Sequence, residues 1–248
     1  MQKRINKFIS ETGYCSRRAA DRLIEQGRVT INGTLPEVGT IVSEADEIKI
    51  NGELLQNKAA PIYIAFNKPV GITCTTDLNK KDNIIDYLNY PQRIFPIGRL
   101  DKPSEGLIFI TNDGDIVNKI LRAGNKHEKE YEVIVEEPIT DNFIKKMGNG
   151  VKILDTVTQH CFVEQLSKFK FRIILTQGLN RQIRRMCEEL GYSVQKLKRI
   201  RIMHITLAGI PTGKWRYLSS EEIETINQLV ADSSKTEEAS FLSDDIQE

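Results

Sequence analysis

The residues best suited to chemistry lie in one loop that leads into an apolar strand. The stretch IGRLDKPSEGLIFIT (residues 97–111) places Asp101 between Gly98 and Gly106. Functional groups concentrate in loops that a rigid strand holds in place, so Asp101 is the candidate functional carboxylate. The two glycines allow close approach of the backbone. Composition alone leaves a structural alternative open, in which Asp101 only caps a turn.

A second candidate site is the start of a helix expected at residues 180–190. Arg181, Arg184 and Arg185 fall within one turn near its N-terminal end, where cations gain nothing from the helix dipole, so an anionic partner is indicated. One arginine could neutralise a buried carboxylate and the others could contact phosphates. Asn180 is expected to cap this helix. The same basic patch is expected to continue through Lys196, Lys198, Arg199 and Arg201.

Two further residues have open interpretations. Tyr131 begins a strand in the charged stretch KHEKEYEV (residues 126–133), where it is either a half-buried packing residue or an active-site aromatic. Glu105 stands directly before Gly106, and we expect it to face solvent.

Hydrophobic periodicity supplies the elements that must position these residues. Strand patterns cover residues 62–67, 107–111, 131–135, 157–163, 169–175 and 203–207, and helix patterns cover residues 84–88, 115–121, 141–147 and 180–190. Ser219 and Glu222 predict a capping box for a last helix ending at Leu229. Strands mixed with short helices indicate an α+β domain with a mixed, mostly antiparallel sheet.

The first part of the chain predicts a separate small domain. Ile5, Phe8 and Ile9 share one helical face, Ser16 is expected to cap a second helix, and Gly27 to end it. Short strands are expected at residues 29–31 and 47–50. Residues 56–61 lack periodicity and indicate a linker. The predicted domains are therefore residues 1–58 and 59–230, followed by an acidic, disordered tail at 231–248.

The charge distribution indicates a polyanionic partner. The chain has 248 residues with 35 Lys+Arg and 34 Asp+Glu, but nine acids and one base follow residue 220. The first 220 residues therefore carry nine surplus positive charges, which favours nucleic acid, although a solvated surface also explains them. Four scattered cysteines and three histidines argue against disulfides and a zinc site. Without a signal peptide or a long apolar run, the protein is expected to be cytoplasmic and not to bind membranes.

Taken together, the motifs resemble those of the RsuA-type pseudouridine synthases. The resemblance rests on GRLD (98–101) with Ser104, GL (106–107) and TNDG (111–114), on KPVG (68–71), on KEY (129–131) and on QIRRM (182–186). Residues 4 to about 55 are similar to the S4 RNA-binding module of these enzymes. Within the family, residues 122–131 and 209–216 are most similar to members that modify 23S rRNA of the large ribosomal subunit.

The resemblance implies that the protein isomerises uridine to pseudouridine without a cofactor or metal. It makes Asp101, Tyr131 and Arg184 catalytic: Asp101 acts on the ribose–uracil unit, Arg184 pairs with it and keeps it ionised, and Tyr131 stacks on the base and could take the C2′ proton. Arg99 would enter the stack of RNA bases when the uridine flips out. Ile183 would form an apolar wall against the uracil. The implied substrate-binding residues are Arg99, Leu100, Ile183, Lys68, Arg181 and Arg185, and those of the S4 module are Ser16, Arg17, Arg18 and Arg28.

The implied partner is 23S rRNA, with a tRNA anticodon arm as a second candidate, and the chain is expected to act as a monomer. Whether Asp101 attacks C1′, attacks C6 of the base or promotes elimination stays open. One alternative is a non-catalytic S4-type ribosome assembly factor, which would not need the Asp101, Tyr131 and Arg184 set. A glycoside hydrolase using Asp101 and Glu105 is disfavoured by the single tryptophan and the basic surplus.

Overall fold

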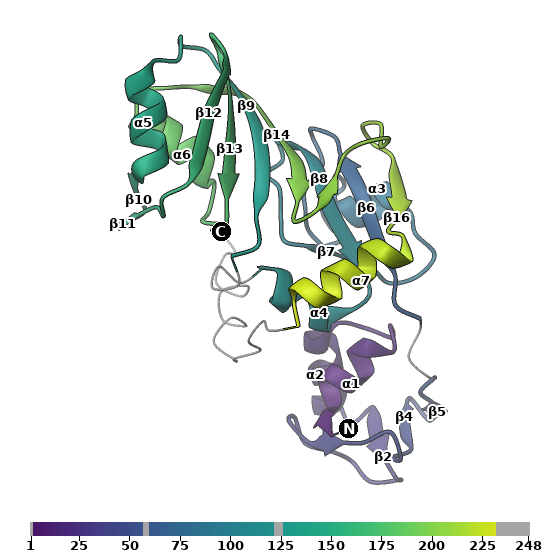
Figure 1. Ribbon diagram of the computed structural model, residues 1–248. Coiled ribbons are helices and arrows are strands. Elements are labelled where there is room, and N and C mark those ends of the chain that lie inside the picture. The colour runs from purple at the N-terminus through teal and green to yellow at the C-terminus, as the bar shows by residue number, and fades with distance from the viewer. Residues whose placement is uncertain (1, 57–59, 122–125, 232–248) are drawn as a thin grey trace. The chain divides into compact units, whose positions relative to one another are not determined.

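The computed structural model describes residues 2–56, 60–121 and 126–231, which form two compact units (Figure 1). The described residues up to 62, with residues 90–94 and 112–114, make the first unit. Residues 63–89, 95–111 and those from 115 onward make the second. The linker expected at 56–61 lies partly outside the described residues, and the acidic tail expected at 231–248 lies almost wholly outside them.

The first unit surrounds a small apolar core that includes the fully buried Ile5 and Ile9. Ser16 caps the second helix as predicted, because its Oγ accepts a hydrogen bond from the Ala19 amide at 3.1 Å. Gly27 follows that helix with a φ of +67°, which also confirms the prediction. The elements are α1 (Ile5–Glu11), α2 (Arg17–Glu25), β1 (Lys3–Arg4), β2 (Val29–Ile31), β3 (Ile41–Val42), β4 (Ile48–Ile50) and β5 (Glu53–Leu54).

The second unit is built on a nine-stranded sheet, with the order β12–β13–β9–β14–β8–β6–β16, β7 beside β8 and β15 beside β14. Among the strand pairs of the described residues in this sheet, β14–β8 alone is parallel, so the predicted mixed, mostly antiparallel α+β class is confirmed. The strands are β6 (Tyr63–Lys68), β7 (Phe95–Ile97), β8 (Glu105–Thr111), β9 (Lys129–Val135), β12 (Phe162–Ser167), β13 (Lys170–Leu175), β14 (Val194–Ile202), β15 (Ile205–Thr206) and β16 (Trp215–Tyr217), and β10 (Lys152–Ile153) pairs separately with β11 (Thr156–Val157).

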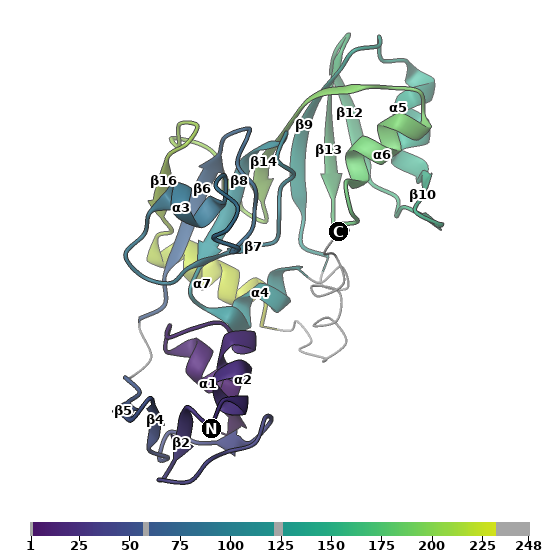
Figure 2. The same cartoon turned by 180° about the vertical axis from the view of Figure 1, so that it is seen from behind.

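Helices cover both faces of this sheet. They are α3 (Ile84–Leu88), α4 (Gly114–Leu121), α5 (Asp141–Asn149), α6 (Gln182–Glu189) and α7 (Ser220–Leu229). Helices α4 and α7 contribute to the core beneath β6 and β8, whereas α3 lies on the opposite face, as Figures 1 and 2 show together. Helices α5 and α6 lie against the β12–β13 end, where Phe143 packs edge-on against Phe171 with 5.3 Å between ring centroids. None of the described helices is long and apolar enough to cross a membrane.

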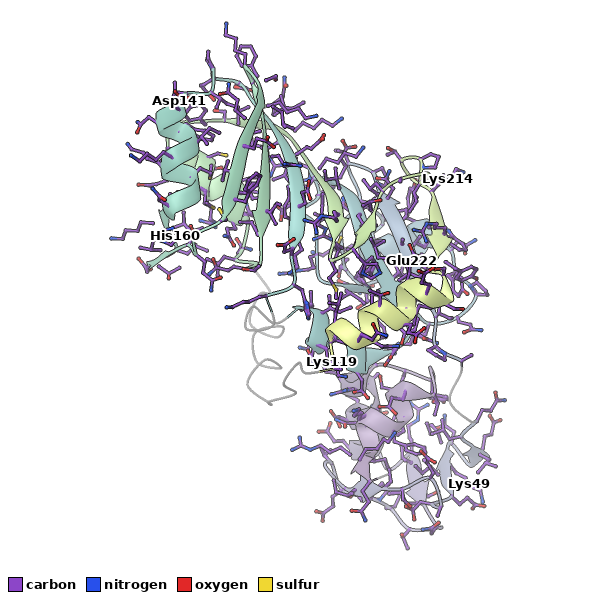
Figure 3. All side chains as sticks on the ribbon, in the orientation of Figure 1. Lys49, Lys119, Asp141, His160, Lys214 and Glu222 are labelled. Atoms are coloured by element: carbon purple, nitrogen blue, oxygen red, sulfur yellow. The ribbon has the colours of Figure 1, made fainter. Side chains whose placement is uncertain are left out.

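The predicted capping box fastens α7 to the sheet. Ser219 Oγ accepts from the Glu222 amide at 3.2 Å, and the Ser219 amide donates to Glu222 Oε2 at 2.8 Å. Arg216 on β16 donates to both oxygens of Glu222 at 2.7 Å, so one carboxylate caps the helix and anchors a strand. Glu222 is labelled on α7 in Figure 3.

Two strand predictions were wrong. The strand expected at 203–207 is only the short β15, and the long strand β14 covers residues that the sequence predicts to form a basic surface. The strand expected at 157–163 is divided into β11 and β12. Thr158 is buried there and exchanges hydrogen bonds with Val151, donating from its amide at 3.0 Å and accepting at Oγ1 at 2.9 Å, which draws the chain out of the strand.

Gly106 should be essential for the fold, because a Cβ at this position would lie 2.2 Å from the backbone oxygen of Arg199 and the φ is +112°. We expect Gly106→Ala to lower the free energy of unfolding by about 3 kcal/mol or more, from overpacking and backbone strain. Urea denaturation measures this loss. Gly178→Ala is the matched control, since nothing lies within 4 Å of its Cβ. Equal stability of the two variants would contradict the proposed close approach of β8 and β14.

Candidate active site

Asp101 lies in the loop between β7 and β8 with its carboxylate partly accessible. The side chain is 35% exposed, and its Oδ2 lies 3.8 Å from Arg184 Nε. The loop is closed by a backbone bond from the Ser104 amide to the Asp101 carbonyl at 2.9 Å. Within the described chain, the Asp101 carboxylate accepts no hydrogen bond. The turn-capping alternative is therefore not supported, and the carboxylate is available to a substrate.

Arg184 on α6 holds this loop. Its Nη2 donates to Ser104 Oγ at 3.1 Å and to the Pro103 carbonyl at 3.2 Å, and its Nη1 donates to the Val194 carbonyl at 3.4 Å. The guanidinium is buried; burial lowers the pKa of Arg184, and the nearby Asp101 carboxylate opposes that shift. One arginine thus joins the Asp101 loop to α6 and β14. Sequence reasoning gave Ser104 no role, although the serine stands inside the GRLD-to-GL signature.

The start of α6 differs from the prediction. Arg181 occupies the N-cap position in a left-handed conformation with φ of +48°, and its side chain makes no capping bond. Asn180 does not cap the helix; it accepts hydrogen bonds from Arg185, at the carbonyl (3.2 Å) and at Oδ1 (3.3 Å). Gln182 Oε1 instead accepts a hydrogen bond from the Leu179 amide at 2.9 Å. The Asn180 cap prediction was therefore wrong.

Tyr131 lies on β9 opposite Arg199 of β14. It is 9% exposed, and the Arg199 guanidinium carbon lies 5.9 Å from the centroid of its ring. Arg199 Nε also donates to the Leu107 carbonyl on β8 at 2.6 Å. Tyr131 forms no hydrogen bond to Asp101 in the part of the chain that the structure describes. It is connected to the strand that follows the Asp101 loop through Arg199.

The chain that follows β6, from the KPVG segment to Asp82, fastens the other side of the Asp101 loop. The Gly71 amide donates to the Lys102 carbonyl at 2.8 Å, and the Leu100 amide lies 3.4 Å from Cys74 Sγ. The Lys102 ammonium pairs with Asp82 at 2.9 Å. These contacts hold both neighbours of Asp101, so the segment serves to keep the loop in place.

Lys68 supports that segment from within. It is fully buried, and its Nζ donates to the Pro69 and Ile72 carbonyls, each at 2.9 Å. Burial lowers its pKa, and the Arg199 guanidinium acts in the same direction, whereas Cys74, Asp101 and Glu105 oppose the shift. Contact between Lys68 and a substrate stays a prediction.

Three buried cations near the site lack a carboxylate within 4.0 Å among the described residues: Lys68, Lys129 and Arg199. Burial and the neighbouring Arg199 lower the pKa of Lys129 to about 8. Buried charges that no carboxylate neutralises create a strong local potential, because little solvent screens them. The interior around Asp101 is therefore positive and favours an anionic substrate.

The remaining predicted site residues take varied positions. Leu100 and Ile183 are buried, whereas Arg99 and Arg181 are exposed, as are Arg17 and Arg18 at the start of α2. Arg28 is exposed and donates to Asn51 Oδ1 at 2.8 Å. The roles predicted for these residues stay predictions.

The prediction of a continuous basic patch at residues 196–201 was wrong. Lys196 pairs with Glu105 at 2.8 Å, Arg201 pairs with Glu130 at 2.6 Å, and Arg199 is buried. The four bases lie on a strand, so alternate residues face opposite sides, and carboxylates on neighbouring strands pair with Lys196 and Arg201. Glu105 is only 7% exposed, which corrects its predicted solvent-facing position. Because its carboxylate is paired with Lys196, it is also a poor second carboxylate for glycoside hydrolysis.

Comparison with known proteins gives a consistent picture. Residues 62–189 match the family described as RNA pseudouridylate synthase, and residues 3–48 match the S4 domain. The chain is 57% identical to the dual-specificity RNA pseudouridine synthase RluF of Escherichia coli O157:H7, over 93% of this chain and 80% of that protein. It is 34% identical to the ribosomal large subunit pseudouridine synthase B of Bacillus subtilis (strain 168), over 92% of this chain and 96% of that protein. A crystal structure of a pseudouridylate synthase aligns with a TM-score of 0.67 at 29% identity, covering 90% of this chain and 99% of that one.

Lys129 should make the stability of the chain depend on pH in a defined direction. Its pKa is about 8 in the folded chain against an ordinary value of 10.5. Below pH 8 both states carry the proton, and the folded state bears the cost of burying the charge. Between these pH values the folded chain releases the proton while the unfolded chain keeps it, so the free energy of unfolding rises with pH.

We therefore expect wild type to gain up to about 3 kcal/mol of unfolding free energy relative to Lys129→Met between about pH 7.5 and about pH 10.5. Chemical denaturation of both proteins across this range measures the gain, and the variant serves as the reference for all other titrating groups. A stability difference that is independent of pH would contradict a buried, charged Lys129.

Proposed function

The chain belongs to the RNA pseudouridylate synthase family and is an RNA pseudouridine synthase, and we propose that it acts on a uridine of 23S rRNA and also on a uridine in a tRNA anticodon arm. The observation that carries the proposal is the accessible Asp101 carboxylate beside the buried Arg184 guanidinium, at 3.8 Å. The names of the two relatives, one of dual specificity and one acting on the large ribosomal subunit, support the choice of RNAs.

The reaction conserves every atom of the nucleotide. The C1′–N1 bond breaks, a C1′–C5 bond forms, the hydrogen on C5 leaves as a proton, and N1 gains a proton. Asp101 is the group that acts on the ribose–uracil unit, by attack at C1′, by attack at C6 or by removal of the C2′ proton. Each route needs a carboxylate that is not engaged by its own loop, as found for Asp101.

Other residues of the site serve recognition and alignment. Tyr131 stacks on the target base, and Ile183, buried on α6, supplies an apolar wall. Arg99 is exposed directly before the catalytic loop residues and fills the gap that the extruded nucleotide leaves. Extrusion costs a few kcal/mol, least for an unpaired or distorted base, so a uridine in a loop or irregular helix is favoured. Arg181 and Arg185 contact the phosphates that flank it.

Lys68 contributes indirectly, because its ammonium is bound to loop carbonyls. Arg17 and Arg18, which are exposed beside Ser16 at the start of α2, and the exposed Arg28 bind the RNA backbone. We further propose that the enzyme works as a monomer, since every member of the site comes from one chain, and that it works in the cytoplasm with its ribosomal RNA.

The proposal predicts that cells of the source organism that lack this gene miss one pseudouridine in 23S rRNA and one in a tRNA anticodon arm. Pseudouridine mapping should show a 23S rRNA site that disappears in the deletion strain and returns when the wild-type gene is supplied. The Asp101→Asn variant should fold, bind RNA and fail to restore the site, because the amide cannot act as nucleophile or base. Asp155→Asn, at an exposed turn, is the matched control and should restore it.

Three results would contradict parts of this account. A missing site in 16S rRNA instead of 23S rRNA would overturn the proposed substrate. An unchanged set of tRNA pseudouridines would overturn the second substrate class. Full restoration by Asp101→Asn would remove Asp101 from the catalytic role.

A further inference from the structure

We propose that Arg199 is a positioning residue for catalysis, whose buried guanidinium fixes the ring of Tyr131 relative to the strand that carries the Asp101 loop. The inference deepens the proposed function and rests on it for its kinetic part. It concerns a residue that sequence analysis assigned to a surface patch and that the structure places in the interior.

The connections of Arg199 span three adjacent strands. Its strand, β14, lies between β9, which carries Tyr131, and β8, which follows the Asp101 loop. The guanidinium carbon lies 5.9 Å from the centroid of the Tyr131 ring, and Nε donates to the Leu107 carbonyl at 2.6 Å. On the backbone side, Gly106 approaches Arg199 so closely that no Cβ fits between them. One side chain therefore sets the position of Tyr131 relative to β8.

The burial of this arginine is hard to explain by packing alone. Arg199 is 4% exposed, and in the described part of the chain no carboxylate lies within 4.0 Å of it. Its Nη2 is buried without a hydrogen-bond partner. By contrast, Arg201 on the same strand pairs with Glu130 at 2.6 Å, and Arg172 on β13 pairs with Glu164 at 2.6 Å. An apolar side chain would fill the place of Arg199 at lower cost in desolvation, so the charge itself needs an explanation.

The mode of contact suits a tyrosine that must act on a substrate. A cation over an aromatic face is attracted by the negative potential of the ring, so Arg199 can hold Tyr131 without using its hydroxyl. No described residue forms a hydrogen bond to that hydroxyl. The ring is thus held in place while the hydroxyl stays available for the ribose or base.

The first test compares single-turnover rates on 23S rRNA fragments for Arg199→Met, Arg199→Lys and wild type. A misplaced Tyr131 should reduce the rate constant of Arg199→Met about 10- to 100-fold, with little change in RNA affinity. Arg199→Lys keeps the charge over the ring and should recover part of the rate. Arg172→Met is the matched control, because Arg172 lies on the opposite face of the sheet and pairs with Glu164. A wild-type rate constant for Arg199→Met would overturn the proposal.

The second test observes the tyrosine directly and needs no activity. 3-Fluorotyrosine placed at position 131 gives one ¹⁹F signal, which should shift and broaden in Arg199→Met, move less in Arg199→Lys and stay unchanged in Arg172→Met. An unchanged signal in Arg199→Met would overturn the positioning role even if the rate falls. If Arg199→Met does not fold, the Arg199→Lys signal decides in the same way. A wild-type chain inactive on 23S rRNA would refute the proposed substrate, while the ¹⁹F comparison would still test the contact.

Discussion

A single buried guanidinium, that of Arg184, joins the parts of the molecule that must act together. It binds the Asp101 loop at Ser104 and Pro103, reaches the start of β14 at Val194, and places its Nε 3.8 Å from the Asp101 carboxylate. Planar, multidentate donors are what an arginine offers and a lysine does not. Arg184 therefore aligns the Asp101 carboxylate, while that carboxylate accepts no hydrogen bond from the backbone of its own loop.

The charges around this arginine set the character of the site. Lys68, Lys129 and Arg199 are buried nearby and have no ion-pair partner among the described residues, so the interior is electropositive. On the other face of the strands, Glu105, Glu130 and Glu164 neutralise lysines and arginines in pairs. The positive surplus seen in the sequence is therefore not spread evenly. Part of it is buried near the catalytic loop, where an anionic substrate gains most from it.

The features that the sequence predicts correctly are helix bounds and helix caps, which depend on residues close together in the chain. Helix α3 has the predicted bounds, and the Ser219–Glu222 capping box and the Ser16 cap form because the partners lie within a few residues of each other. The motifs also identified Asp101 and Arg184, which the structure brings together.

Contacts between residues far apart in the sequence could not be predicted from such local patterns. The burial of Glu105 depends on Lys196, which lies far along the chain on a neighbouring strand, and the true neighbour of Arg199 is Tyr131 across the sheet. Asn180 has a residue type that favours the N-cap position, but Arg181 occupies that position and Asn180 accepts a hydrogen bond from Arg185. In each case tertiary structure determines which residue the side chain contacts, and hydrophobic periodicity and helix or strand propensity carry no information about that contact.

Catalysis depends, in this structure, on the Arg184 guanidinium aligning the Asp101 carboxylate for reaction. The most direct measurement is the single-turnover rate constant of Arg184→Met on a 23S rRNA fragment, with the RNA dissociation constant measured in parallel. We expect a folded variant whose rate constant falls about 100-fold or more while RNA binding changes little, because the carboxylate remains but loses its alignment. A folded Arg184→Met that reacts at the wild-type rate would contradict it.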